Sequence, residues 1–461
     1  MDFNSLFFVE IYLLLSLLIY YFVRLISKNN TFVLNITLLI LSLFFYLWRA
    51  GFVYFAMMFA VGLLNYLIAQ IVGKTKNKPL FIMGIMLNTV YLFFFKYCNP
   101  VFKAFGLSFS LIFPLAISFI TFHSISYLVD AYRDKTNYKE VSVIDYLLYI
   151  FLFMKLVEGP ISRFEQVKER HESLPLFTSG ILRFGFGLAK KVIVADTLAT
   201  LTTAVYTNSA TIGTGLSWLS VLTFALQIYF DFSGYCDMAI GVGRMFGYEF
   251  DENFKLPYTA LSISSFWRKW HITLSNWFKE YVYIPLGGNR KGLLRTLLNI
   301  FIIFVLTGIW HGNQITFLFW GLYFAFFMIL ERLFLGKLLE KNKIKFFNSI
   351  YVLFVVSIGW VLFRSYSIET ASNMFKNLFT YQPNTSETTF ISLFTFKILL
   401  MIIIGILFSG PIQNLYNHLP NKVKENKVVY YGKYVICFIL IFVATMFLAS
   451  NSFNPSLYGD F

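Results

Sequence analysis

The chain has 461 residues, of which 58% are hydrophobic, 20% are aromatic and only 13% are charged. This composition, with a mean hydropathy of +0.67, excludes an ordinary soluble enzyme, a disordered chain and a collagen-like fibre. The net charge of +15 comes from 38 Lys and Arg against 23 Asp and Glu. We attribute it to basic membrane-flanking loops and not to nucleic-acid binding, because no basic stretch is long.

Apolar runs in chain order predict membrane-spanning helices joined by short polar links. The runs lie at about 5–27, 32–48, 52–73, 79–97, 180–206, 214–247, 296–311, 314–335, 347–364, 391–410 and 429–449. Between 100 and 160 the pattern is interrupted by residues such as Pro114 and Asp130, which is typical of helices that break or re-enter inside a protein-lined cavity. We therefore predict an all-α polytopic membrane protein, with one membrane-embedded domain over 1–461.

Metal binding and disulfide chemistry are not expected. The three cysteines, Cys98, Cys236 and Cys437, are widely spaced in apolar surroundings. Such spacing builds neither a zinc motif nor a disulfide framework.

The segment 264–290 differs from a generic span, because three of the eight Trp residues fall between 267 and 277. On one continuous helix, a single face would carry Trp267, His271, Leu274, Phe278 and Tyr281. This spacing predicts an amphipathic helix at the membrane interface, serving either chemistry or anchoring alone. The following Pro285-Leu-Gly-Gly-Asn-Arg290 is expected to end the helix in a tight turn.

His311 follows Trp310 at the end of an apolar run. A histidine at membrane depth is costly unless it meets a polar partner or cavity, and its ordinary pKa of about 6.5 suits proton transfer. The two interpretations are a catalytic group and a hydrogen bond across helices. Among the other histidines, we expect His123 to pack in the core, and His171 and His418 to be solvated.

Two acids, Asp231 and Asp237, interrupt another apolar run. Six residues on a helix place them about 120° apart, so they are not expected to share a proton. We expect them to pair with buried Arg or Lys, or to cap helices broken near Gly234.

Four strings in this order resemble the membrane-bound O-acyltransferase family, and most closely its bacterial branch that acetylates exported polysaccharides such as alginate and peptidoglycan. They are Tyr229-Phe-Asp-Phe-Ser-Gly-Tyr-Cys-Asp-Met-Ala, Ser265-Phe-Trp-Arg-Lys-Trp-His-Ile-Thr-Leu-Ser, Tyr283-Ile-Pro-Leu-Gly-Gly-Asn-Arg and Trp310-His-Gly. Further matches occur at Pro114-Leu-Ala-Ile-Ser-Phe and Trp360-Val-Leu-Phe-Arg.

The resemblance implies a ring of about 11–13 helices and re-entrant segments around a central tunnel with an outer funnel, built on core motifs within 114–364. It implies that His311, in the family's invariant motif, and His271, the second family histidine, are catalytic. Candidates to line or support the tunnel are Asp231, Trp267, Trp310, Asn289 and Arg290.

The C-terminal tail, 450–461, adds a further expectation from the same resemblance. Relatives in this branch end with a Tyr three residues before a terminal Phe, and this Tyr is a proposed acyl relay. Tyr458 stands in that position, although Gly459 and Asp460 depart from the usual residues. The alternative is a frayed tail.

The implied function is transfer of an acetyl group from a cytoplasmic thioester to an extracytoplasmic polysaccharide, by a multi-pass protein of the bacterial cytoplasmic membrane. The donor substrate is acetyl-CoA or an acyl carrier protein, no cofactor is bound, and a secreted serine-hydrolase-like acyltransferase is the expected partner. A basic group would attract such a donor: Arg268, Lys269, Arg290, Lys291 and Arg295. The alternatives are D-alanyl transfer to teichoic acids by the same fold, a non-enzymatic transporter and an assembly scaffold.

Overall fold

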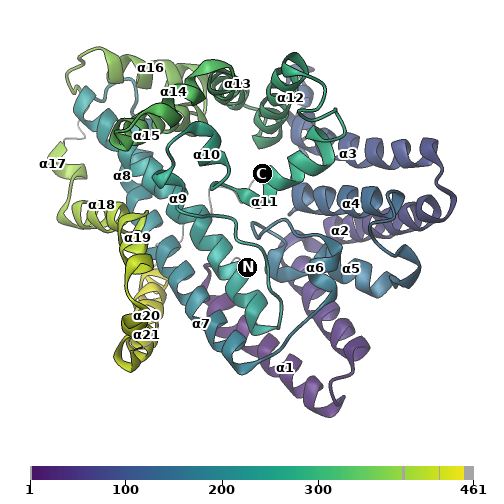
Figure 1. Cartoon of the computed structure of the whole chain (residues 1–461). Coiled ribbons are helices and arrows are strands. Elements are labelled where there is room, and N and C mark those ends of the chain that lie inside the picture. Colours follow the sequence, from purple (N-terminus) through teal and green to yellow (C-terminus); the bar gives the residue numbers. More distant parts are fainter. Residues whose placement is uncertain (1–2, 387–389, 425, 451–461) are drawn as a thin grey trace. The chain divides into compact units, whose positions relative to one another are not determined.

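The computed structural model describes residues 3–386, 390–424 and 426–450, and every regular element within these ranges is helical (Figure 1). In that part of the chain, eight helices are long and apolar enough to cross a membrane, or nine if the bent pair Phe396–Phe408 and Pro411–His418 is one span. The predicted all-α polytopic architecture is confirmed. The described residues divide into two compact units, 3–186 with 235–251 and 187–234 with 252–450, which we describe separately.

The first unit is built from long apolar helices that pack against shorter, buried ones. Its elements are η1 (Phe7–Tyr12), α1 (Leu13–Ile26), α2 (Thr31–Thr75), α3 (Lys78–Ala104), α4 (Ile117–Tyr132), η2 (Tyr138–Glu140), α5 (Val143–Phe151), η3 (Phe153–Lys155), α6 (Phe164–Lys168) and most of α7 (Leu174–Ala189). Helix α2 packs on α3, α4 and α5, and α4 is buried from Ile117 to Ala131. The end of α9 (Thr214–Met245) also belongs to this unit.

Helix α2 is broken where the sequence predicts a link between two spans. Gly51 has φ 76° and ψ 163°, a left-handed extended conformation that only glycine adopts without strain. Each arm of α2 has the length expected of a membrane crossing. The predicted boundary between the runs 32–48 and 52–73 is thereby confirmed.

His123 packs inside this unit, as expected from the sequence, but its neighbours are polar as well as aromatic. Its Nε2 lies 3.2 Å from Nζ of Lys155, and both residues are fully buried. The Lys155 amine also lies 4.1 Å from the centre of the Tyr149 ring. His123 therefore lies in the core of the first unit, where its Nε2 pairs with Lys155 and its buried Nδ1 has no hydrogen-bond partner among the described residues.

The second unit carries the remaining helices. They are η4 (Lys190–Ala195), α8 (Asp196–Thr207), most of α9, η5 (Pro257–Thr259), α10 (Ile263–Trp267), α11 (Ile272–Phe278), η6 (Lys279–Tyr283), α12 (Leu293–His311), α13 (Ile315–Leu330), η7 (Glu331–Leu335), α14 (Gly336–Lys341), α15 (Lys345–Arg364), α16 (Ile368–Phe379), α17 (Phe390–Leu393), α18 (Phe396–Phe408), α19 (Pro411–His418), α20 (Asn421–Lys424) and α21 (Lys427–Ala449). Helix α13 packs between α12 and α15, while α18 and α21 pack on η4.

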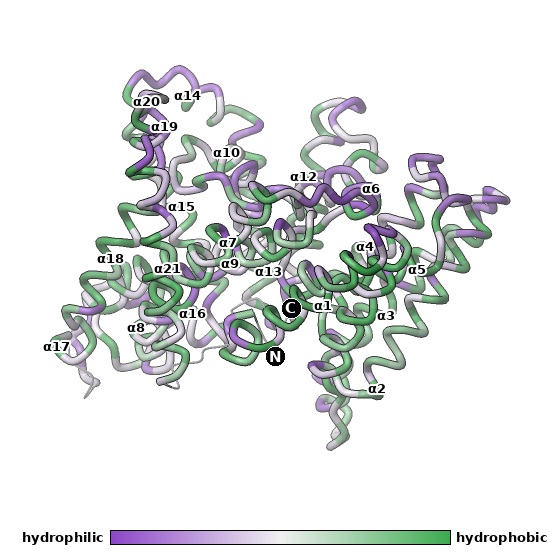
Figure 2. Tube along the Cα trace, turned by 90° about the horizontal axis from the view of Figure 1, so that it is seen from below, coloured by the Kyte–Doolittle hydropathy of each residue, from purple (hydrophilic) through white to green (hydrophobic). Residues whose placement is uncertain are grey.

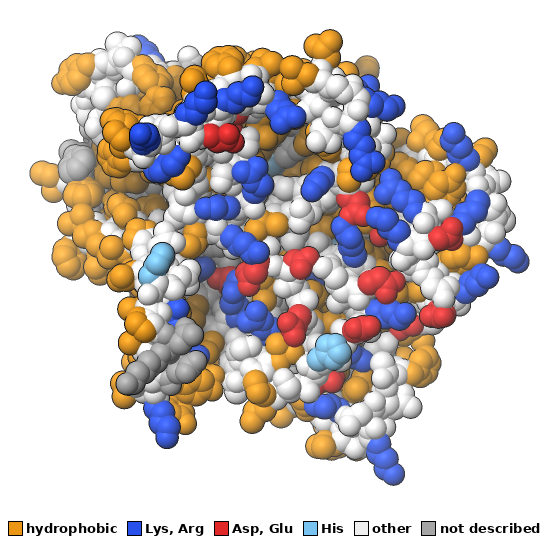
Figure 3. Space-filling model, in the orientation of Figure 1, with side chains coloured by type: hydrophobic (Ala, Val, Ile, Leu, Met, Phe, Trp, Pro, Cys, Tyr) orange, Lys and Arg blue, Asp and Glu red, His pale blue; other side chains and the backbone are white. Residues whose placement is uncertain are grey.

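Hydrophobic residues run along the long helices, and hydrophilic ones gather at their connections (Figure 2). Large apolar side chains such as Leu18 and Phe22 on α1 are more than 60% exposed. Charged side chains crowd the face shown in Figure 3, with hydrophobic ones around them. Apolar surface of this kind requires a lipid environment, so the chain is a multi-pass membrane protein.

Helix α9 continues through Gly234, so the predicted break there is wrong. A Cβ at Gly234 would lie 2.8 Å from the carbonyl oxygen of Gly187. The glycine serves close packing of α9 against α7 and η4 and leaves the helix intact.

Candidate active site

His311 is the last residue of α12, and its place is fixed by close packing of α12 on α13. The two helices approach at Gly308 and Gly321, where a Cβ on Gly308 would lie 2.6 Å from the carbonyl oxygen of Phe317. Small residues allow such backbone proximity between membrane helices. His311 lies about one turn after Gly308 on α12. The close contact between α12 and α13 at Gly308 therefore fixes the position of the imidazole along the axis of α12.

Aromatic rings surround the His311 imidazole, which is only 3% exposed. The ring centre of Trp310 lies 4.7 Å away, that of Trp320 4.9 Å, that of Phe363 5.0 Å and that of Phe317 6.0 Å. Trp320 and Phe363 are nearly perpendicular to the imidazole. Rings of this kind keep bulk water from the imidazole and hold it in one orientation.

The segment that carries His271 is not one continuous helix, so that prediction is wrong. Helix α10 ends at Trp267, His271 has φ 46° and ψ 53°, and α11 begins at Ile272. The backbone N–H of Ile272 donates to the carbonyl of Asn253, and that of Lys255 donates to the carbonyl of Lys269. These pairings with the preceding loop replace the hydrogen bonds that would continue α10.

His271 is held by a polar cradle in this turn. Its Nδ1 lies 3.2 Å from Oδ1 of Asn253, which also accepts hydrogen bonds from the Thr273 backbone N–H at 3.1 Å and the Thr273 hydroxyl at 3.0 Å. The Phe232 ring stands perpendicular to the imidazole, with centres 4.7 Å apart. Burial lowers the pKa of His271 to about 3, so the imidazole is neutral at cellular pH.

Glu331 binds the N-terminal end of the segment that carries His271, at the start of α10. One carboxylate oxygen accepts the backbone N–H of Ile263 at 2.6 Å, and the other accepts the N–H and hydroxyl of Ser264 at 2.8 and 2.7 Å. The carboxylate thus satisfies free N–H groups at the start of α10, where the helix dipole favours negative charge.

Both histidines belong to one connected cluster of aromatic rings within the second unit. Trp320 contacts both Trp267, at 5.6 Å between ring centres, and His311. Trp360 contacts both Trp270, the residue before His271, at 4.9 Å, and Trp320 at 6.4 Å. The sequence candidates Trp267 and Trp310 are therefore parts of this cluster.

The two acids of α9 have the partners expected from the sequence. Within the second unit, Asp231 lies 2.6 Å from Nζ of Lys191, which also lies 2.8 Å from Asp196. Within the first unit, Asp237 lies 2.7 Å from Arg183. Asp231 precedes Phe232, so its ion pair fixes the part of α9 that touches His271.

Asn289 and Arg290 lie on the turn after η6. Gly287 and Gly288 have φ angles of 104° and 56°, which confirms the predicted tight turn. Both Asn289 and Arg290 are exposed there. Neither side chain reaches His271 or His311 by a hydrogen bond among the described residues.

The five basic residues predicted to attract a donor differ in exposure. Arg268, Arg290 and Lys291 are exposed, whereas Lys269 and Arg295 are half-buried and hydrogen-bond within the unit. Tyr458 lies outside the described residues.

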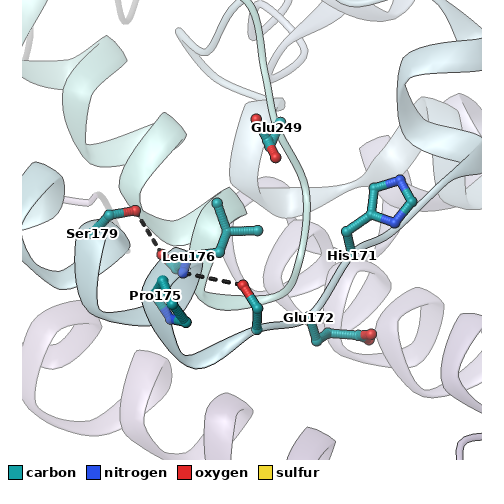
Figure 4. A pocket seen from close by; sticks show the side chains of 7 residues that line it. His171, Glu172, Pro175, Leu176, Ser179 and Glu249 are labelled. Atoms are coloured by element: carbon teal, nitrogen blue, oxygen red, sulfur yellow. Dashed lines mark hydrogen bonds between the residues drawn. The ribbon is translucent and has the colours of Figure 1, made fainter.

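An open pocket of about 510 Å³ lies in the first unit (Figure 4). Glu172 at its edge accepts a hydrogen bond from Tyr20, and the side chain of His171 is 76% exposed, so this histidine is solvated as predicted. The lining residues are His171, Glu172, Ser173, Pro175, Leu176, Ser179 and Glu249. No group of three His, Cys, Asp or Glu that could hold a metal occurs in the part of the chain that the structure describes.

Comparison with known proteins decides the family. A family model, membrane-bound O-acyltransferase, matches residues 120–368, which include both histidines. The chain belongs to the membrane-bound O-acyltransferase family. It is accordingly a membrane O-acyltransferase.

Individual proteins of this family are similar to the chain over part or most of its length. The chain is 34% identical to the probable alginate O-acetylase AlgI of Pseudomonas putida, over 93% of this chain and 94% of that protein. It is 31% identical to the peptidoglycan O-acetyltransferase of Helicobacter pylori, over 82% and 79% of the two chains. The teichoic acid D-alanyltransferase of Bacillus subtilis is 28% identical, over 46% of this chain and 58% of that protein.

Sequence reasoning missed three residues that support the site. Lys191 and Glu331 are charged residues in apolar runs, a signal that marks buried partners and could have found them. Asn253 lies in a polar loop and carries no such signal.

Proposed function

We propose that this chain transfers an acetyl group from a cytoplasmic thioester across the membrane to an extracytoplasmic polysaccharide. The observation that carries the proposal is the buried cluster of rings around His311 and His271, in a chain similar to alginate and peptidoglycan O-acetylases over most of its length. A water-poor aromatic site protects a thioester from hydrolysis and strengthens the hydrogen bonds made to the reacting atoms.

In this proposal His311 is the general base. The acceptor hydroxyl attacks the thioester carbonyl, and His311 takes the hydroxyl proton. The carbon–sulfur bond then breaks, and His311 returns the proton to the departing thiolate. The products are an ester and a free thiol, so no further reactant is needed. His271 is the second catalytic histidine.

The donor in this proposal is acetyl-CoA or the thioester of an acyl carrier protein, and it approaches a tunnel from the cytoplasmic side. The exposed guanidinium and ammonium groups of Arg268, Arg290 and Lys291 would attract its phosphate or acidic surface. On the outer side, Tyr458 or the polysaccharide itself receives the acetyl group, and a secreted serine-hydrolase-like partner completes the transfer.

The experiment replaces His311 by Ala in cells and measures ester-linked acetate on the surface polysaccharides. General acid–base catalysis contributes roughly 10²–10⁴-fold, so we expect acetate to fall to the level of a deletion strain. The control is His418→Ala, an exposed histidine of α19, which should leave acetylation intact. Full acetylation by His311→Ala, at normal membrane abundance, would contradict the proposal.

The likeness to a teichoic acid D-alanyltransferase supports a second candidate, transfer of D-alanine to teichoic acid. The two functions differ in the product. Mass spectrometry of base-released esters from wild-type and deletion strains distinguishes them, because the first function predicts acetate and the second predicts alanine.

A further inference from the structure

The cradle around His271 contains atoms whose hydrogen-bonding roles are fixed. The backbone N–H of Thr273 can only donate, and it lies 3.1 Å from the Asn253 side chain. The atom that faces it must therefore be the amide oxygen of Asn253. This removes the usual ambiguity between the oxygen and nitrogen of an asparagine side chain.

That oxygen in turn fixes the proton on His271. A carbonyl oxygen only accepts, so the His271 Nδ1 that lies 3.2 Å from it must carry a hydrogen. The lowered pKa of His271 leaves the ring neutral, with a single N–H. Its Nε2 then carries a lone pair. Nε2 is buried and has no hydrogen-bond partner among the described residues.

The surroundings prevent the ring from adopting the opposite orientation. Asn253 is fully buried, and its own carbonyl accepts the Ile272 N–H at 3.0 Å, so the residue is tied to the turn by its backbone and side chain. Phe232 packs perpendicular to the imidazole. A flipped ring would place the carbon Cδ2 where Nδ1 now lies and would lose the hydrogen bond to the amide oxygen. The other tautomer of the unflipped ring would place a nitrogen lone pair against that oxygen, which is repulsive.

We propose that Asn253 is a positioning residue that holds His271 as the Nδ1–H tautomer, so that Nε2 accepts a hydrogen bond from the attacking hydroxyl group. The inference rests on the proposed acyl transfer, and it gives His271, the second histidine, a specific role. His271 acts on the nucleophile, a sugar or tyrosyl hydroxyl, and does not donate to the thioester carbonyl. The hydroxyl group donates its hydrogen bond to Nε2 of His271 as it binds, which positions its oxygen. When the oxygen attacks the thioester carbonyl, the O–H bond turns from Nε2 to His311, which takes the proton and returns it to the departing thiolate.

The tautomer is tested without any reaction. Full-length protein with ¹⁵N-labelled histidine, in lipid nanodiscs at neutral pH, is examined by solid-state NMR, and the spectrum of His271→Gln is subtracted to assign the signal. We expect a protonated Nδ1 and an unprotonated Nε2. A protonated Nε2 would overturn the inference, whatever the activity of the protein.

The kinetic test compares three variants in acetyl transfer from acetyl-CoA to de-O-acetylated surface polysaccharide over a range of pH. Asn253→Asp keeps the acceptor and adds a negative charge, which raises the pKa of His271 by roughly 1–3 units. We expect transfer to persist, with its acid limb moved to higher pH. Asn253→Ala should lower kcat by roughly 10²-fold with little change in KM, because the tautomer is no longer selected.

Thr273→Val is the matched control, because it removes one hydrogen bond from the same oxygen but leaves the contact with His271. It should keep the wild-type pH profile. An unchanged profile in Asn253→Asp would overturn the inference. The expected tautomer together with full activity in His271→Gln would instead contradict the proposed role of His271 in transfer.

Discussion

His311 and His271 lie in the same unit and the same aromatic cluster, but different contacts hold them. His311 lies among four aromatic rings at the end of α12, and the close contact between Gly308 and α13 fixes the position of that helix. His271 stands in a left-handed turn and faces an amide oxygen and one ring. Packing therefore fixes where the His311 imidazole lies, while hydrogen bonds fix which nitrogen of His271 carries the proton.

The largest effect is expected at the glycine crossing. Gly308→Ala places a methyl group against the backbone of α13, which cannot yield, and overpacking of this kind costs about 1–3 kcal/mol. We expect a lower thermal midpoint in detergent and loss of transfer. The measurement is thermal unfolding by intrinsic fluorescence, paired with the acetyl-transfer rate.

Gly432→Ala in α21 is the control for that variant, because a Cβ there meets nothing within 4 Å. Alanine stabilises a helix over glycine by about 1 kcal/mol. This control should be neutral or slightly stabilising. A Gly308→Ala protein as stable and as active as the control would contradict the conclusion that the close contact of α12 with α13 positions His311.

A smaller effect is expected at Glu331, whose carboxylate binds the start of the segment that carries His271. Glu331→Ala removes the three hydrogen bonds that its carboxylate accepts at the start of α10 but leaves the N-cap bond from Ser265 to Ser262, and loss of hydrogen bonds at a helix N-terminus costs about 0.5–2 kcal/mol. We expect transfer to fall several-fold while the α12–α13 crossing is kept. Rates and thermal midpoints are measured beside Glu340→Ala, an exposed acid of α14 that should change neither.

Equal behaviour of Glu331→Ala and Glu340→Ala would show that α10 does not need the Glu331 carboxylate. The turn of His271 would then be held by the loop of Asn253 alone.

Local sequence patterns predicted most of the membrane spans, because a long apolar run is itself the signal of a span. The run at 180–206 is the exception, since no helix there is apolar enough to be a candidate span among the described residues. They also predicted the kind of partner that Asp231 and Asp237 would find, since a buried carboxylate needs a cation. They failed for 264–281, where helical spacing pointed to one helix. The competing hydrogen bonds come from the loop at Asn253, and such tertiary contacts leave no periodic signal.

A double-mutant cycle tests whether His311 and His271 serve one acyl-transfer site. The rate of acetyl transfer is measured for purified His311→Gln, His271→Gln and the double variant. Groups that act in one step are non-additive, so we expect the double variant to be no slower than the slower single variant. Losses that multiply, or a single variant with the wild-type rate, would contradict the account.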